Sequence, residues 1–339
     1  MLSNQIATSN IKMKTYQQLW QSLTPLYDAG EAQAIVRTVL DVKYGMTLTD
    51  IICGKVNEIS ADEERKLEEI IIRLQKGEPV QYVLGEADFA GRPFHVEPGV
   101  LIPRPETAEL CQWIEKDMIE KSIVSSGDSS EDSSGNSPQA TDDARLILDI
   151  CTGSGCIAIT LGLNIPNSEV TGWDISEDAL RIAQGNVEMM KAGNVRIEHQ
   201  DALALPKAAE TDNEKMKGND DKEVVKPKGE AKTPSTPKWD LIVSNPPYIC
   251  EKEKADMEKN VLEHEPSLAL FVPDEDPLKF YRAIAEYASS ALKSGRALYF
   301  EINPIYEKET REMLLKLDFK DIETKEDAFG KKRMMRAIK

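Results

Sequence analysis

The sequence predicts an α/β protein with a mostly parallel sheet, and three stretches carry this prediction. Residues 145–150 form a short apolar run that is followed by a glycine-containing turn at 151–156 and a helix-forming stretch. Residues 169–174 form a second such run, which ends in an acid, and residues 241–243 form a third, which runs into Asn-Pro-Pro-Tyr at 245–248. Short runs rich in β-branched residues, separated by helix-forming stretches, are typical of strands buried in a parallel sheet.

The Asn-Pro-Pro-Tyr segment is predicted to be a rigid turn at the carboxyl edge of this sheet, where open α/β sheets bind ligands. Neither proline can donate to a neighbouring strand, and each disfavours helical backbone in the residue before it. Asn245 and the Pro246 carbonyl could bind both hydrogens of a planar NH2 group, and Tyr248 could stack on it. We therefore expect Asn245, Pro246 and Tyr248 to be catalytic, and these three with Pro247 to bind substrate. The alternative is a turn with a purely structural role.

The glycine turn and the acid that follows it indicate a site for S-adenosylmethionine. Gly153 and Gly155 allow close approach of the backbone to a ligand, and the helix that begins here offers free N–H groups to an anion such as the methionine carboxylate. Asp174, about twenty residues on, is suited to binding two ribose hydroxyls. A dinucleotide is a weaker interpretation, because Ala158 stands where the full fingerprint has a third glycine. The alternative is an ordinary strand-to-helix turn.

Another candidate contact is with adenine. The predicted strand at 195–199 is followed by Asp201, which could bind adenine directly or through the backbone of its neighbour, or could be an ordinary loop acid. The complete set of expected cofactor contacts is Cys151, Thr152, Gly153, Ser154, Gly155, Asp174, Asp201, Ala202 and Asn245.

With these motifs, the sequence resembles the HemK/PrmC family of protein-glutamine methyltransferases. The likeness runs through residues 77–85, 89–91 and 100–107, where Pro-Arg-Pro-Glu-Thr stands at 103–107, then through the glycine turn, Asp174, the Asn-Pro-Pro-Tyr segment and residues 330–333. Two positions depart from the family. Cys151 stands where glycine is common, and Glu301-Ile302-Asn303-Pro304 follows the fifth strand where the family often has a glycine.

The resemblance implies a Rossmann-like, seven-stranded class I methyltransferase domain with the last strand antiparallel. It also implies methyl transfer from S-adenosylmethionine to the side-chain amide nitrogen of the glutamine in the Gly-Gly-Gln motif of class 1 peptide chain release factors. The product of the cofactor would be S-adenosylhomocysteine. Glutamine methylation of a ribosomal protein and amino-methylation of adenine or cytosine in nucleic acid are the alternatives, and a non-enzymatic cofactor- or factor-binding protein is a third.

The chain is expected to have three parts. Helical periodicity over 15–76, with a capping box at Ser60, predicts a small helical domain (1–76), which by resemblance helps to hold the release factor. Glycine, proline and short alternating runs predict a β-hairpin linker at 77–103. The methyltransferase domain would then span 104–339, with a helix from 108 to about 121, a mobile loop from the Asn-Pro-Pro-Tyr segment to residue 265, and disordered inserts at 122–143 and 207–238, which have few apolar residues.

Composition limits the other function classes. The net charge of −17 argues against direct nucleic-acid binding, because phosphate recognition needs clustered lysine and arginine. No apolar run is as long as a membrane span, and the five cysteines have no Cys-x-x-Cys spacing, which favours reduced thiols. Each of the three histidines lacks a ligand partner at metal-site spacing, so we expect no metal. We expect a cytoplasmic monomer.

Overall fold

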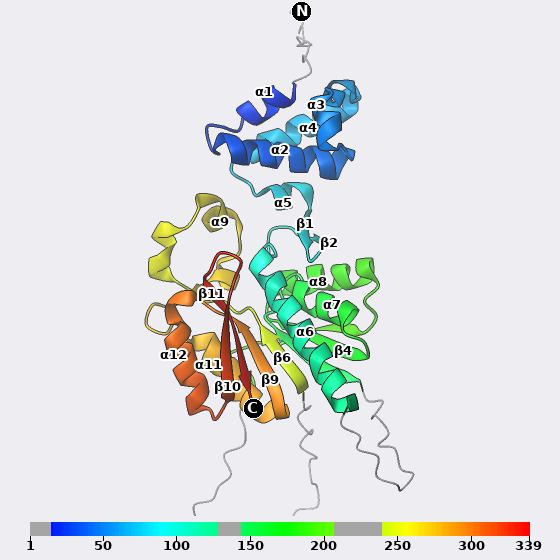
Figure 1. Cartoon of the computed structure of the whole chain (residues 1–339). Coiled ribbons are helices and arrows are strands. Elements are labelled where there is room, and N and C mark those ends of the chain that lie inside the picture. Colours follow the sequence, from blue (N-terminus) through cyan, green and yellow to red (C-terminus); the bar gives the residue numbers. More distant parts are fainter. Residues whose placement is uncertain (1–14, 128–143, 207–238) are drawn as a thin grey trace, which may run out of the picture. The chain divides into compact units, whose positions relative to one another are not determined.

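The computed structural model describes residues 15–127, 144–206 and 239–339, which divide into two compact units (Figure 1). The first unit holds the residues up to Ala87, with His95–Pro98 and Asp256–Pro266, and the second holds the remainder. The segment Asp256–Pro266 is thus grouped with the helical unit, although it lies within the range expected for the methyltransferase domain. Residues 128–143 and 207–238, which contain most of the expected inserts, lie outside the described residues.

The first unit is helical, as the periodicity predicts. Its elements are α1 (Tyr16–Gln21), α2 (Ala29–Tyr44), α3 (Leu48–Ile52), the 3-10 helix η1 (Lys55–Glu58), α4 (Ala61–Leu74), α5 (Val80–Leu84) and α9 (Lys259–His264). Helix α4 begins at the predicted capping box, because the Ser60 hydroxyl accepts from the backbone of Glu63 while the Glu63 carboxylate accepts from the backbone of Ser60 at 2.9 Å. Leu40, Ile71 and Leu74 are fully buried in the core of this unit.

The prediction of a hairpin linker over 77–103 was wrong in extent. The hairpin consists of β1 (Glu86–Phe89) and β2 (Arg92–His95), and it is preceded by helix α5. Pro79 and Gly85 flank α5, and Gly85 ends it in the left-handed conformation. A helix this short provides about one turn, so its apolar residues show no recognisable periodicity in the sequence.

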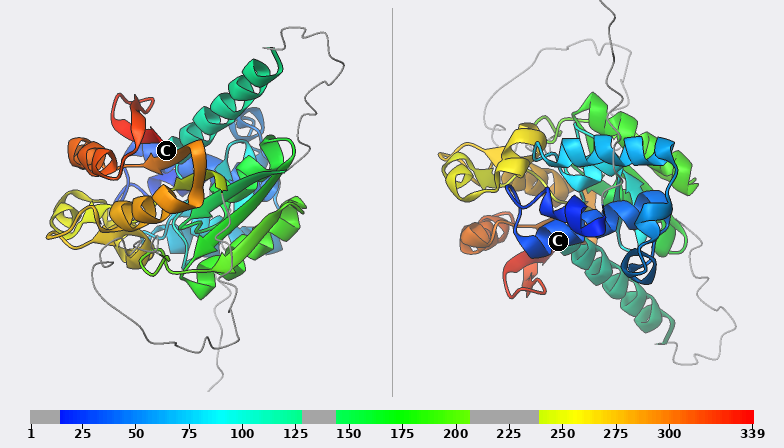
Figure 2. Two further views of the ribbon diagram at one scale, coloured as in Figure 1. Left: turned by 90° about the horizontal axis from the view of Figure 1, so that it is seen from below. Right: turned by 90° about the horizontal axis from the view of Figure 1, so that it is seen from above.

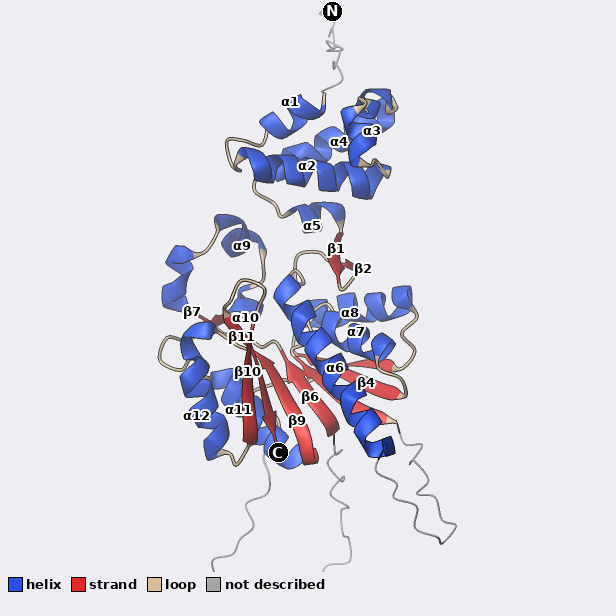
Figure 3. Ribbon diagram, viewed as in Figure 1, coloured by secondary structure: helices blue, strands red, loops and turns tan. Residues whose placement is uncertain are grey.

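The second unit is built on the seven-stranded sheet that the resemblance implies (Figure 3). Its strands are β3 (Arg145–Ile150), β4 (Ser168–Asp174), β5 (Val195–His199), β6 (Trp239–Ser244), β9 (Leu292–Glu301), β10 (Lys320–Glu326) and β11 (Lys332–Ile338). They lie in the order β10-β11-β9-β6-β3-β4-β5. The last strand, β11, is antiparallel to both of its neighbours, and the pairs on the other side of β9 are parallel.

Helices cover both faces of this sheet (Figure 2). Successive residues of a strand point to opposite faces, so Ile147 belongs to one core and Leu148 to the other. The first core includes residues of α6 (Pro105–Gly127), α7 (Cys156–Asn164) and α8 (Glu177–Met190), and the second includes residues of α11 (Lys279–Ala291) and α12 (Glu307–Lys316). Helix α8 is capped by Ser176, whose side chain accepts from the backbone of Ala179.

Two other expectations need correction. Helix α6 continues to Gly127, beyond the predicted end near 121 and into the expected insert, because no glycine or proline interrupts it earlier. The segment expected to be a loop before residue 265 contains the 3-10 helix η2 (Glu251–Asp256) and α9, and it starts with strand β7 (Ile249–Cys250), which pairs with β8 (Phe271–Val272) after the short helix α10 (Ser267–Leu270). None of the described helices has the length and apolar character needed to span a membrane.

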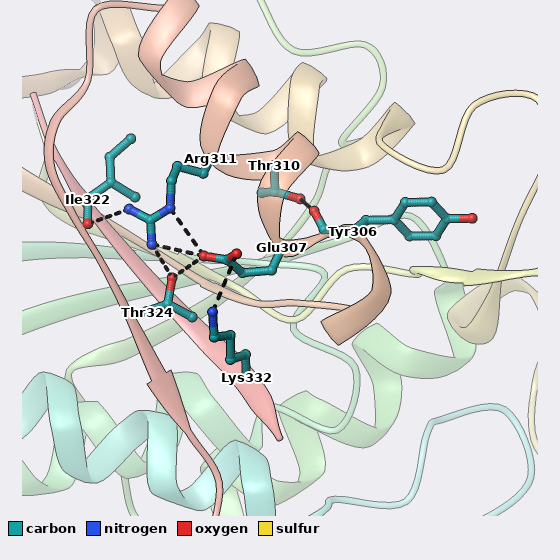
Figure 4. A network of polar contacts seen from close by, with 7 residues as sticks. All are labelled: Tyr306, Glu307, Thr310, Arg311, Ile322, Thr324 and Lys332. Carbon is teal, nitrogen blue, oxygen red and sulfur yellow. Dashed lines mark hydrogen bonds and ion pairs between the residues drawn. The ribbon is translucent and has the colours of Figure 1, made fainter. Parts of the chain in front are cut away.

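A polar network connects α12 to strands β10 and β11 (Figure 4). Arg311 donates to the Glu307 carboxylate at 2.9 Å, to the Ile322 carbonyl at 2.7 Å and to the Thr324 hydroxyl at 2.6 Å. Lys332, the first residue of β11, lies 3.8 Å from Glu307. The network therefore links α12 to the start of β11, which lies next to the carboxyl end of β9.

Candidate active site

The predicted site residues come together because the central strands are in register. The last residues of β3 and β6 pair with one another, and the last residue of β6 pairs with the penultimate residue of β9. The next residues along the three strands, Cys151, Asn245 and Glu301, therefore lie in one row at the carboxyl edge. Asp174 ends β4, the neighbour of β3 on the other side.

The glycine turn is held by a buried carboxylate of strand β3. Oδ2 of Asp149, which is fully buried, accepts from the Thr152 hydroxyl at 2.6 Å and from the Ala158 backbone N–H at 3.2 Å. Its other oxygen has no hydrogen-bond partner among the described residues. Burial raises the pKa of Asp149 to about 7, although both hydrogen bonds act to lower it. Sequence reasoning missed this residue, and an acid inside an apolar strand was the available signal.

Asp174, the last residue of β4, also accepts a hydrogen bond from the glycine turn. The backbone N–H of Gly153 donates to Oδ2 of Asp174 at 2.9 Å, and that of Ser176 donates to Oδ1 at 3.0 Å. Burial raises the pKa of Asp174, and these backbone hydrogen bonds oppose the shift. Gly153 has a φ of +56°, and a Cβ there would meet nothing within 4 Å, so the backbone is open at this point. At Gly155 a Cβ would lie 3.3 Å from Ala183, so this glycine also permits close packing on α8.

Cys151 occupies a backbone conformation that favours glycine. Its φ is +64°, in the left-handed region that L residues adopt at a cost. This conformation gives a physical reason for the glycine that is common here in the resembling family. The cysteines, histidines and acids of the described ranges form no cluster of three or more that could hold a metal ion.

The Asn-Pro-Pro-Tyr turn is anchored by side chains outside it. Asn245 is half-buried, and its Nδ2 donates to the Thr107 hydroxyl at 3.2 Å. Thr107 is the threonine of the Pro-Arg-Pro-Glu-Thr segment and lies in the first turn of α6. Pro246 and Pro247 are buried, and the Tyr248 hydroxyl donates to Oε1 of Glu301 at 3.0 Å.

Glu301 contacts both the Pro-Arg-Pro-Glu-Thr segment and the Asn-Pro-Pro-Tyr turn. Its Oε2 accepts from the Thr107 hydroxyl at 2.6 Å, so the carboxylate contacts both Thr107 and Tyr248, and only 2% of the residue is exposed. Burial raises the pKa of Glu301, while the hydrogen bonds from Thr107 and Tyr248 and the charge of Arg333 act to lower it. Sequence reasoning flagged this position only as a departure from the family, although an acid that ends an apolar strand in the same row was visible.

The loop after β9 is shaped by an asparagine. The Asn303 side chain accepts from the backbone of Ile305 at 3.1 Å, and its Nδ2 donates to the Tyr248 carbonyl at 3.2 Å and to Glu253. The backbone of Asn303 donates to the Tyr281 hydroxyl at 3.1 Å. This departure from the family's glycine therefore supports the Asn-Pro-Pro-Tyr turn instead of leaving the loop unconstrained.

Asp201 and Ala202 follow β5, which lies beside β4. Oδ1 of Asp201 accepts from the backbone of Leu203 at 2.7 Å, so the acid forms a local turn, and Ala202 is buried. Both follow β5 at the edge of the sheet where Asp174 ends β4.

Comparisons with known proteins agree with this arrangement. A family model described as the PrmC N-terminal domain matches residues 24–85, and one described as a methyltransferase domain matches residues 141–266. The chain is 42% identical to a release factor glutamine methyltransferase of Bacteroides thetaiotaomicron, over 94% of this chain and 96% of the relative.

Two further relatives carry the same name. That of Flavobacterium psychrophilum is 35% identical, and that of Bacillus subtilis is 32% identical. Both matches cover 96% of this chain and 98% of the relative. Since these relatives are similar over nearly their whole length, the chain belongs to the release factor glutamine methyltransferase family.

Proposed function

We propose that this chain transfers a methyl group from S-adenosylmethionine to the side-chain amide nitrogen of the glutamine in the Gly-Gly-Gln motif of class 1 release factors. The observation that carries the proposal is the row at the carboxyl edge of the sheet. In it, the turn suited to the cofactor follows β3 and the turn suited to an amide follows the adjacent strand β6. A cofactor and an amide bound at these two turns would be neighbours.

The residues present fit the cofactor. A carboxylate accepts about four hydrogen bonds, and the backbones of Gly153, Ile175 and Ser176 donate three to Asp174, so one acceptor position remains for a ribose hydroxyl. The N-terminus of α7 and the open backbone at Gly153 suit the methionine carboxylate. Asp201 and Ala202 remain the candidates for adenine.

The Asn-Pro-Pro-Tyr turn would hold the glutamine amide in line with the methyl group of the cofactor. When bound, S-adenosylmethionine supplies a methyl group that is already activated on a sulfonium. Oδ1 of Asn245 and the carbonyl of Pro246 would accept the two N–H groups of the glutamine, which holds its nitrogen in place. These bonds strengthen as positive charge develops on the nitrogen, so Asn245 and Pro246 stabilise the transition state more than the bound substrate. Pro247 would hold the turn and Tyr248 would pack against the amide.

The proposal is tested by offering the purified protein labelled S-adenosylmethionine with a class 1 release factor. The matched control is the same release factor with alanine in place of the glutamine of its Gly-Gly-Gln motif. Label on that glutamine, located by mass spectrometry and absent from the alanine version, is the expected result. Parallel reactions with ribosomal protein and with duplex DNA test the two alternative substrates, and label only on one of these would contradict the proposal.

A further inference from the structure

The Asn245 side chain can serve the proposed function in only one of its two orientations. A glutamine amide that is to be methylated presents two N–H donors, so the group that holds it must be an acceptor. Asn245 has an acceptor, Oδ1, at one corner of its amide and a donor, Nδ2, at the other. A 180° rotation of the amide would present the donor to the substrate and lose the bond.

The contacts around Thr107 select the correct orientation. Both oxygens of Glu301 accept from hydroxyl groups, Oε1 from Tyr248 and Oε2 from Thr107, so the single proton of the Thr107 hydroxyl is directed at Oε2 of Glu301 at 2.6 Å. The Thr107 oxygen then has only lone pairs left for Asn245. Nδ2 of Asn245 is the end that can use them, and it lies 3.2 Å away. Oδ1 is thereby left for another donor.

We propose that Glu301 is a positioning residue that acts through Thr107 to fix the orientation of the Asn245 amide, so that Asn245 presents its carbonyl oxygen to the substrate glutamine. This inference rests on the proposed function and names a determinant of it. The hydrogen bonds run in one direction, from Asn245 to Thr107 to Glu301, because both oxygens of Glu301 accept from hydroxyl groups.

Glu301 is itself well fixed. Its other carboxylate oxygen accepts from Tyr248 at 3.0 Å, and its backbone carbonyl accepts from the Tyr281 hydroxyl at 3.3 Å. Thr107 and Glu301 are each 2% exposed, so water does not readily substitute for either partner. The same carboxylate therefore holds both ends of the Asn-Pro-Pro-Tyr turn.

Two substitutions remove the directionality while changing the shape little. Glu301→Gln places an amide where the carboxylate was, and its NH2 end can donate to Thr107, which frees the hydroxyl proton to go to Oδ1 of Asn245. Thr107→Val removes the hydroxyl. Thr107→Ser keeps the hydroxyl and serves as the conservative rescue variant. Thr310→Val is the matched control, because Thr310 is a fully buried threonine on α12 whose hydroxyl donates to the Tyr306 carbonyl at 2.8 Å.

The experiment measures kcat on the release factor, the affinity for S-adenosylhomocysteine by calorimetry, and the melting temperature of each variant. We expect Glu301→Gln and Thr107→Val each to lower kcat by about tenfold or more, the cost of one misdirected hydrogen bond, with cofactor affinity retained. Thr107→Ser and Thr310→Val should keep kcat within about threefold of wild type. Wild-type kcat in both Glu301→Gln and Thr107→Val, or a loss in Thr107→Ser equal to that in Thr107→Val, would overturn the inference.

A second measurement does not depend on turnover. In the wild type, a nuclear Overhauser effect between the Asn245 side-chain NH2 and the Thr107 methyl group should be observed, and it should weaken in Glu301→Gln as the amide populates both orientations. Its absence in the wild type would contradict the inference. If the wild type methylates no release factor, the proposed function fails, and this effect alone then decides whether Glu301 and Thr107 set the amide.

Discussion

The backbone N–H of Gly153 donates a 2.9 Å hydrogen bond to the carboxylate of Asp174, so the acid expected to bind ribose also fixes the glycine turn. Asp174→Ala would remove this bond and the acceptors for the ribose together. We expect the substitution to weaken binding of S-adenosylhomocysteine by about 10- to 100-fold, since hydrogen bonds to a charged group contribute about 1.5–3 kcal/mol. Isothermal calorimetry measures the affinity directly, and equal affinity in the two proteins would refute the assignment.

Asn245→Ala should affect turnover of the substrate more than binding of the cofactor. It removes an acceptor that strengthens its bonds as charge develops on the glutamine nitrogen, so kcat should fall by about 100- to 1,000-fold. The cofactor turn lies on a different strand, and its contacts with Asp149 and Asp174 do not involve Asn245. Affinity for S-adenosylhomocysteine should therefore change far less than kcat, although the expected contact between Asn245 and the cofactor is lost. A turnover close to wild type would show that Asn245 does not hold the substrate.

The buried carboxyl of Asp149 should make stability depend on pH. In the folded protein Asp149 keeps its proton up to about pH 7, whereas an unfolded aspartate loses its proton near its ordinary pKa of 3.8. Unfolding therefore releases a proton between these values, and the free energy of unfolding falls as pH rises from about 4 to about 7, by roughly 4 kcal/mol at most for this group.

The comparison with Asp149→Asn isolates this contribution, because other titrating groups cancel in the difference. Urea unfolding of the cofactor-free proteins should show the stability of Asp149→Asn rising relative to wild type across this range and levelling off above it. A difference that stays constant with pH would mean that Asp149 is ionised throughout.

The positive φ of Cys151 predicts which replacements the turn accepts. Cys151→Gly fits the backbone and should retain cofactor affinity. Cys151→Val places a β-branched side chain in the left-handed region and should destabilise the protein by about 1–3 kcal/mol. Thermal unfolding and cofactor titration of both variants provide the check. Equal behaviour of the glycine and valine variants would rule out backbone strain as the reason that glycine is common here.

The sequence was most informative where structure is set locally. The capping box at Ser60 and the strand that runs into Asn245 both depend on residues a few positions apart, and each is found where it was expected. Helix α5 was missed because it is shorter than the period that would reveal it.

The network around the amide could not be predicted in this way. Thr107 and Asn245 are 138 positions apart in the chain, and Thr107 and Glu301 are 194 apart. Their contact depends on β9 lying next to β6 and on α6 beginning near the carboxyl ends of these strands. Both are properties of the assembled sheet. Sequence patterns identified both motifs and could not show that one carboxylate connects them.

The most direct test of the central claim is a structure of the protein with S-adenosylhomocysteine and a peptide that contains Gly-Gly-Gln. We expect the glutamine nitrogen to donate to Oδ1 of Asn245 and to the carbonyl of Pro246, with the Asn245 NH2 still directed at Thr107. A glutamine bound elsewhere, or one whose carbonyl oxygen accepts from the Asn245 NH2, would contradict it.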